Sequence, residues 1–150
     1  MKSVKLVLVL FIAALFSSCS TLRLTPVDFS WPLESVVQIN QNGVAQDVRH
    51  SLAINTKPLY FAETGDSTKY SDQAIRIIRD AKGFYYITAE NFTSVYVFKD
   101  DESSMIIENK IVVNIKGLKK PAFNLRAPYV ELIDGTNKLL LDATGVKGDK

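Results

Sequence analysis

The fold class depends on how one stretch is read, SDQAIRIIRDAK at residues 71–82. With a period of about 3.6 residues, its apolar residues gather on one side of a helix and most of its polar and charged residues on the other. Ser71 suits the N-cap of such a helix, and Gly83 stands where a left-handed residue commonly follows the last turn. The stretch therefore predicts one amphipathic helix over 71–82.

The alternative is a strand over 74–79 that ends in a turn at 80–83. The two structures distribute the isoleucines differently. A helix buries Ile75 and Ile78 on the same side, whereas a strand places Ile75 and Ile77 on one face and turns Ile78 to the other. We favour the helix because the caps and the period agree.

Two strands are predicted directly after this stretch, at 84–90 and 93–99. Both are rich in aromatic and β-branched residues, and each is apolar on both faces. That pattern is typical of central strands that are covered on both sides. We expect a helix on one face and a second sheet or a loop on the other.

Hairpins account for most of the remaining chain. Asn42-Gly43 is a strong turn signal, because both residues tolerate positive φ. The elements expected are strands from 36 and over 44–54, a short strand at 59–61, a loop at 64–70, strands at 105–108 and 111–115, a connection over 117–128, and a hairpin at 129–133 and 138–142. The predicted class is α+β, mostly antiparallel β with one helix near 71–82; the alternative is an all-β sandwich or meander.

The N-terminal segment has the layout of a secretory signal. Lys2 and Lys5 form a basic head, and residues 6–16 are an unbroken apolar run of 11 residues. Such a run is too short for a membrane span, which needs about 20 residues. The run leads into LFSSC at 15–19, which contains the only cysteine of the chain, Cys19.

This segment resembles the lipobox of bacterial lipoproteins, although Phe16 stands where that family prefers Leu. The resemblance implies that residues 1–18 are a signal peptide, that Cys19 is the lipidation site, and that 19–30 are a lipidated tether. Ser20, in place of the Asp that often retains such proteins at the inner membrane, implies the outer membrane. The absence of an acidic export signal after Cys19 implies a domain that faces the periplasm. A plain secretory signal or an N-terminal membrane helix is the alternative.

The rest of the chain, residues 31–145, has the length of one ordinary domain, and 146–150 are expected to fray. Of the 18 Lys and Arg, two lie in the predicted signal, so 16 cations balance the 16 Asp and Glu. The mature chain after residue 18 is therefore formally neutral, which gives no reason to expect a nucleic acid as partner. With Cys19 lipidated, no thiol remains for a disulfide.

The sequence contains no recognisable catalytic set, and we expect no enzyme, no cofactor and no metal site. The single histidine, His50, lies in a predicted strand without a second metal ligand nearby, and no serine lies in a nucleophile elbow. The acidic run at 100–102 is typical of a solvated hairpin tip. Asp66-Ser67-Thr68 resembles a short O-glycosylation signal of one Gram-negative phylum, so Ser67 is a candidate modification site.

Aromatic residues are the candidates for binding. Trp31, the only tryptophan, lies where the tether meets the domain, and Tyr85, Tyr86 and Tyr96 lie in the predicted central strands. We predict a lipid-anchored, non-enzymatic envelope protein that binds another protein, as an accessory subunit of an outer-membrane assembly. The alternative is a glycan- or lipid-binding module that uses these aromatics as stacking platforms. The lysines of 116–126 suit a solvated connection, with contact to anionic lipid as the other interpretation.

Overall fold

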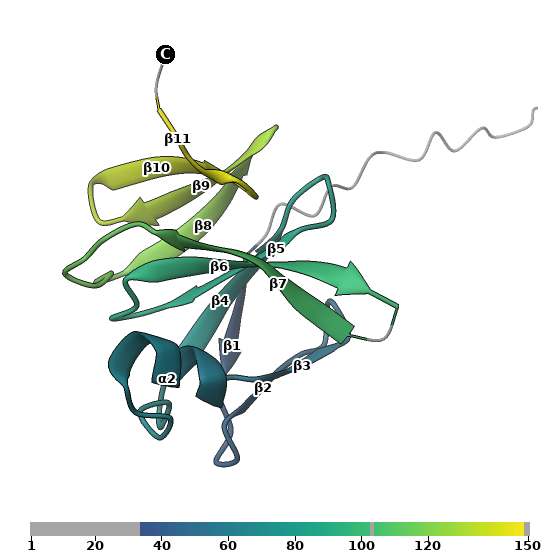
Figure 1. Ribbon diagram of the computed structural model, residues 1–150, viewed down its shortest axis with the longest axis vertical. Helices are drawn as coiled ribbons and strands as arrows, with labels where there is room; N and C mark the ends of the chain where they lie inside the picture. The colour runs from purple at the N-terminus through teal and green to yellow at the C-terminus, as the bar shows by residue number, and fades with distance from the viewer. Residues whose placement is uncertain (1–33, 103, 149–150) are drawn as a thin grey trace, which may run out of the picture.

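The computed structural model describes residues 34–102 and 104–148, which form mostly antiparallel β-structure with one short helix (Figure 1). In chain order the elements are β1 (Ser35–Gln38), β2 (Val44–Asp47), β3 (Leu52–Asn55), α2 (Lys57–Thr64), β4 (Ala74–Arg79), β5 (Tyr85–Ala89), β6 (Ser94–Asp101), β7 (Ser104–Val112), β8 (Pro121–Arg126), β9 (Tyr129–Asp134), β10 (Asn137–Asp142) and β11 (Gly145–Lys147). They form a central sheet with the order β1-β4-β5-β6-β7, an outer sheet with the order β11-β10-β9-β8, and a small hairpin of β2 and β3.

The central sheet is the middle of three layers (Figure 1). One face, which includes Ile77 and Ile87, packs against α2 and the small hairpin. The other face, which includes Ile78 and Val97, packs against the outer sheet. The prediction that β5 and β6 are covered on both sides is therefore confirmed, although a different helix provides the cover.

The predicted helix over 71–82 is wrong, because Ala74–Arg79 form strand β4. This strand pairs with β1 on one side and with β5 on the other. Both of its faces are covered, so Ile77 and Ile78 are completely buried in opposite cores. The resulting spacing of apolar residues resembles that of an amphipathic helix, although isoleucine, which is β-branched, favours a strand.

Asp80 ends β4 and begins a turn. One carboxylate oxygen of Asp80 accepts the backbone N–H groups of Lys82 and Phe84, each at 2.9 Å, and the other accepts the hydroxyl of Tyr86 at 3.0 Å. Burial, together with the negative charge of Asp80, raises the pKa of Tyr86. The residues taken as the end of a helix therefore form a turn whose polar groups are satisfied locally.

The helix lies earlier in the chain. Lys57–Thr64, expected to be a short strand and the start of a loop, form α2. Pro58 lies in the first turn, where its missing N–H costs nothing. Gly65 follows the last turn with a φ of 73° and donates its N–H to the carbonyl of Phe61 at 2.8 Å.

Four further elements differ from the expectations. The predicted strand over 44–54 is divided into β2 and β3 by a turn at 48–51. The predicted connection over 117–128 contains β8, an edge strand that begins with proline, as edge strands tolerate. Val146 and Lys147, expected to fray, belong to β11, which pairs with β10. The two strands expected at 105–108 and 111–115 are replaced by one strand, β7, which ends at Val112 and has a register shift opposite Val97 and Phe98. Residues 113–115 lie in the connection after it.

Candidate binding groove

A groove of about 740 Å³ lies between β3 and the strands β6 and β7 of the central sheet. Its floor is formed by aromatic and aliphatic side chains such as Tyr85 and Phe98, and β3 and Ile107 line its sides. Most of the lining is apolar. The volume falls within the range of roughly 300–1,000 Å³ that is common for ligand pockets.

The strand β3 lines the groove with its edge. The backbone N–H of Thr56 donates to the carbonyl of Gly43 at 2.9 Å, which marks a hydrogen-bonded pair next to the ladder of β2 and β3. Hydrogen-bonded and non-hydrogen-bonded pairs alternate along an antiparallel ladder. The N–H and C=O groups of Ala53 and Asn55 therefore point away from β2, and both residues line the groove. Within the described residues no strand pairs with this edge.

Two neighbouring isoleucines on β7 differ in which face they occupy. Phe98 pairs with Tyr85 on one side and with Ile107 on the other, so these three residues share the groove face of the sheet. Ile106 pairs with Lys99 and lies on the opposite face. The exposed fractions are similar, 58% for Ile107 and 51% for Ile106. Only Ile107 extends the apolar lining of the groove, and contiguous exposed apolar surface is typical of a contact site.

His50 lies at one end of the groove. Its Nδ1 atom is 2.6 Å from Oδ2 of Asp47, and its ring meets the Tyr85 ring edge-on at 5.5 Å between centroids. Burial alone would raise the pKa of Asp47, but hydrogen bonds from His50 and from the backbone of Arg49 lower it. The pair orders the turn between β2 and β3 and thereby fixes the end of the β3 wall.

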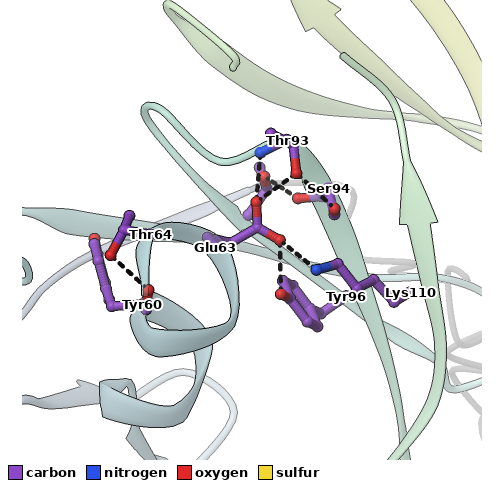
Figure 2. Close-up of polar contacts among 8 residues, drawn as sticks. Tyr60, Glu63, Thr64, Thr93, Ser94, Tyr96 and Lys110 are labelled. Carbon is purple, nitrogen blue, oxygen red and sulfur yellow. Dashed lines mark hydrogen bonds and ion pairs between the residues drawn. The ribbon is translucent and has the colours of Figure 1, made fainter. Parts of the chain in front are cut away.

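The helix α2 contributes Pro58 and Leu59 to the lining, and Glu63 holds this helix against the sheet. Figure 2 shows the Glu63 carboxylate among Thr93, which directly precedes β6, Tyr96 of β6 and Lys110 of β7. It accepts hydrogen bonds from the backbone N–H and hydroxyl of Thr93 at 2.6 and 2.7 Å, and from Tyr96 at 2.7 Å, and pairs with Lys110 at 2.9 Å. Burial would raise the pKa of Glu63, but these bonds outweigh it and hold the pKa at about 2.

The three tyrosines predicted to bind a ligand lie in different places. Tyr85 forms part of the groove floor. Tyr86 is completely buried on the opposite face, where its hydroxyl bonds to Asp80. Tyr96 is buried beneath α2, and its hydroxyl bonds to Glu63. Of the three, only Tyr85 reaches the groove.

The other sequence candidates divide into two groups. Trp31 and Cys19 lie outside the described residues. Ser67 is partly exposed in a turn, next to Asp66, whose carboxylate accepts the N–H and hydroxyl of Thr68 at 2.9 and 2.7 Å. The modification of Ser67 stays a prediction.

Sequence reasoning did not single out β3 or Ile107, because a groove depends on which parts of a sheet its neighbours leave uncovered. The adjacent pair Ile106-Ile107 was the available signal, since consecutive apolar residues in a strand lie on both faces.

Within residues 34–102 and 104–148, no group of three or more His, Cys, Asp or Glu is placed to hold a metal ion. In the same part of the chain, no helix combines the length and apolar character needed to cross a membrane. No family model, no curated protein and no solved structure matches the chain.

Proposed function

We propose that this is a lipid-anchored cell-envelope protein without a catalytic role, whose domain binds an extended segment of another envelope protein in the groove. The observation that carries the proposal is the unpaired edge of β3 beside an apolar floor. A guest strand would form main-chain hydrogen bonds with Ala53 and Asn55, and its alternate side chains would enter the groove. The lipobox at 15–19 supports the anchor and the outer-membrane location.

Two other sheet edges, those of β8 and β7, differ from the edge of β3. Native proteins protect edge strands with charges, proline, bulges or covering groups. On β8, the N–H of Phe123 is bound by the carboxylate of Glu34 at 2.9 Å. The edge strand β7 has a register shift and carries Glu108 and Lys110. The groove edge of β3, by contrast, presents Ala53 and Asn55, which are neither charged nor proline.

The second candidate is a glycan or lipid ligand, which the volume of the groove and the ring of Tyr85 favour. A fatty acyl chain would fill the apolar floor, but it has no donor or acceptor for the backbone groups of Ala53 and Asn55. A peptide strand satisfies both the floor and the edge. We therefore favour a peptide as the ligand of the groove.

The test is co-purification from detergent-solubilised envelopes. Ile107→Lys places a charge in the groove, while Ile106→Lys places the same charge one residue away on the opposite face. Both residues are about half exposed, so both variants should fold. The proposal is supported if one protein co-purifies with the parent and with Ile106→Lys but not with Ile107→Lys. Equal retention by all three contradicts it.

A further inference from the structure

The connection between β7 and β8 presents an isoleucine to solvent. Ile115 is 84% exposed, in a turn that runs from Asn114 to Gly117. The N–H of Gly117 donates to the carbonyl of Asn114 at 3.0 Å, and the Asn114 side chain bonds to the carbonyl of Gly117 and the N–H of Lys116. These bonds define the turn, so Ile115 projects from an ordered structure.

Lysines surround this isoleucine. Lys116, Lys119 and Lys120 are exposed in the same connection. Lys138, at the start of β10, lines a hollow that Asn114 also lines. None of these four lysines forms an ion pair with a described residue.

Two acidic residues lie near these lysines. Asp134 accepts the backbone N–H groups of Lys119 and Lys120 at 3.0 and 2.7 Å. Glu90 precedes Asn91, whose N–H bonds to the carbonyl of Leu118. Among the described residues named here, four cations against two anions leave an excess of positive charge around an exposed apolar side chain.

We propose that this end of the domain, Ile115 with Lys116, Lys119, Lys120 and Lys138, docks onto an anionic lipid surface. The lysines would face lipid phosphates, at about 1 kcal/mol per charge near the surface. Ile115 would enter the headgroup boundary, where an apolar side chain leaves water. An acidic protein would satisfy the lysines but gives no reason for a single exposed isoleucine among them.

The proposed docking surface and the groove lie toward opposite ends of β7. The strand β7 begins at Ser104, which lines the groove, and ends at Val112, three residues before Ile115. Nine residues of strand span about 30 Å. A domain docked through Ile115 would therefore hold the groove away from the membrane, toward a partner. This consequence rests on the proposed function, whereas the docking itself does not.

The predicted tether and the three residues after it separate the predicted anchor from the described domain. Residues 20–33 separate Cys19 from the first described residue, Glu34. At roughly 3.5 Å per residue, 14 residues reach up to about 49 Å. The docking surface would then determine which face of the domain meets the membrane.

The experiment places an environment-sensitive fluorophore at position 115. Ile115→Cys is labelled in the full mature chain, and Val48→Cys is the control, since Val48 is 85% exposed in the turn between β2 and β3. Mass spectrometry first reports the state of Cys19; if it is unmodified, Cys19→Ser is added to both variants. Failure of the anchor is thus seen separately from failure of the docking.

The labelled chains are mixed with vesicles of phosphatidylcholine, with or without phosphatidylglycerol. With phosphatidylglycerol present, we expect the fluorescence of the label at 115 to shift to the blue and to be quenched by nitroxide lipids. Without phosphatidylglycerol, we expect neither change at 115. The label at 48 should show neither change with either kind of vesicle. Lys119→Gln and Lys120→Gln should each lower the docking equilibrium about fivefold. No response at 115, an equal response at 48, or a response that ignores phosphatidylglycerol would overturn the proposal.

Discussion

The hydroxyl of Tyr96 donates a hydrogen bond of 2.7 Å to the carboxylate of Glu63, and this bond joins the only helix of the described residues to strand β6 of the central sheet. The same carboxylate binds Thr93 and Lys110, as Figure 2 shows. Burial, and then the bond to Glu63, raises the pKa of Tyr96 to about 12. One carboxylate therefore fixes α2 to three positions that are distant from it in sequence.

Glu63→Gln should destabilise the domain by about 2–3 kcal/mol at pH 7, because hydrogen bonds to a charged group are lost or weakened. The pKa of Glu63 is about 2 in the folded protein, against an ordinary value of 4.5. A lowered pKa gives stability that is complete above the unfolded value and is lost as the pH falls toward the folded value. Urea unfolding should therefore show a larger loss of stability between about pH 5 and 2 in the parent than in Glu63→Gln. The variant keeps only the loss due to other carboxylates with a lowered pKa, such as Asp142.

Asp142→Asn is the control for this measurement. The pKa of Asp142 is also about 2, since bonds from Thr144 and Lys147 outweigh the effect of burial. Its partners lie in an exposed turn, so its loss should cost less than about 1 kcal/mol. If Glu63→Gln is no more harmful than Asp142→Asn, Glu63 does not fix the helix.

Ile78→Ala should cost about 2–5 kcal/mol, because the side chain is completely buried between the central and outer sheets. Val36→Ala, on the edge strand β1 and 53% exposed, should cost less than about 1 kcal/mol. Both values come from urea unfolding. Equal costs would mean that the outer sheet does not cover this face.

Ala53→Pro tests whether a guest strand uses the edge of β3. The N–H of Ala53 points away from β2, so proline removes a donor at the groove without removing a bond of the small hairpin. Leu52→Pro removes a bond to β2 and should destabilise the domain. We expect Ala53→Pro to unfold at nearly the parental urea concentration and to lose the partner. Retention of the partner by a folded Ala53→Pro would show that the guest does not pair with β3.

Cys19→Ala tests the anchor. The variant should accumulate as an uncleaved or soluble precursor, because the lipid has no attachment site. Fractionation of envelopes and the mass of the N-terminal peptide report the result. If the variant matures and stays with the membranes like the parent, the lipobox interpretation is wrong.

The outline of the fold could be predicted from the sequence where the local pattern and the tertiary environment agree. The turn at Asn42-Gly43 and the last hairpin were expected, and so was the cover on both faces of β5 and β6. The expected helix over 71–82 failed because a strand buried on both faces carries isoleucine at 75, 77 and 78. Burial of Ile78 therefore did not separate helix from strand.

The true helix had signals of its own. Pro58 and Gly65 are seven residues apart and suit the start and the end of a short helix. The apolar run at 59–61, however, is also typical of a short strand. The groove was out of reach for a different reason, because its walls come from β3 and β7, about 50 residues apart, and no local pattern reports how such strands face each other.

Site-specific photo-crosslinking in intact envelopes shows whether a partner strand lies in the groove. A photoreactive amino acid is placed at Ile107, inside the groove, or at Ile106, its equally exposed neighbour on the opposite face. If a partner strand occupies the groove, position 107 gives one discrete protein adduct and position 106 does not, and the adduct is lost when Ala53→Pro is added. Equal adducts from both positions, or an adduct at 107 that contains only lipid or glycan, would contradict the proposal.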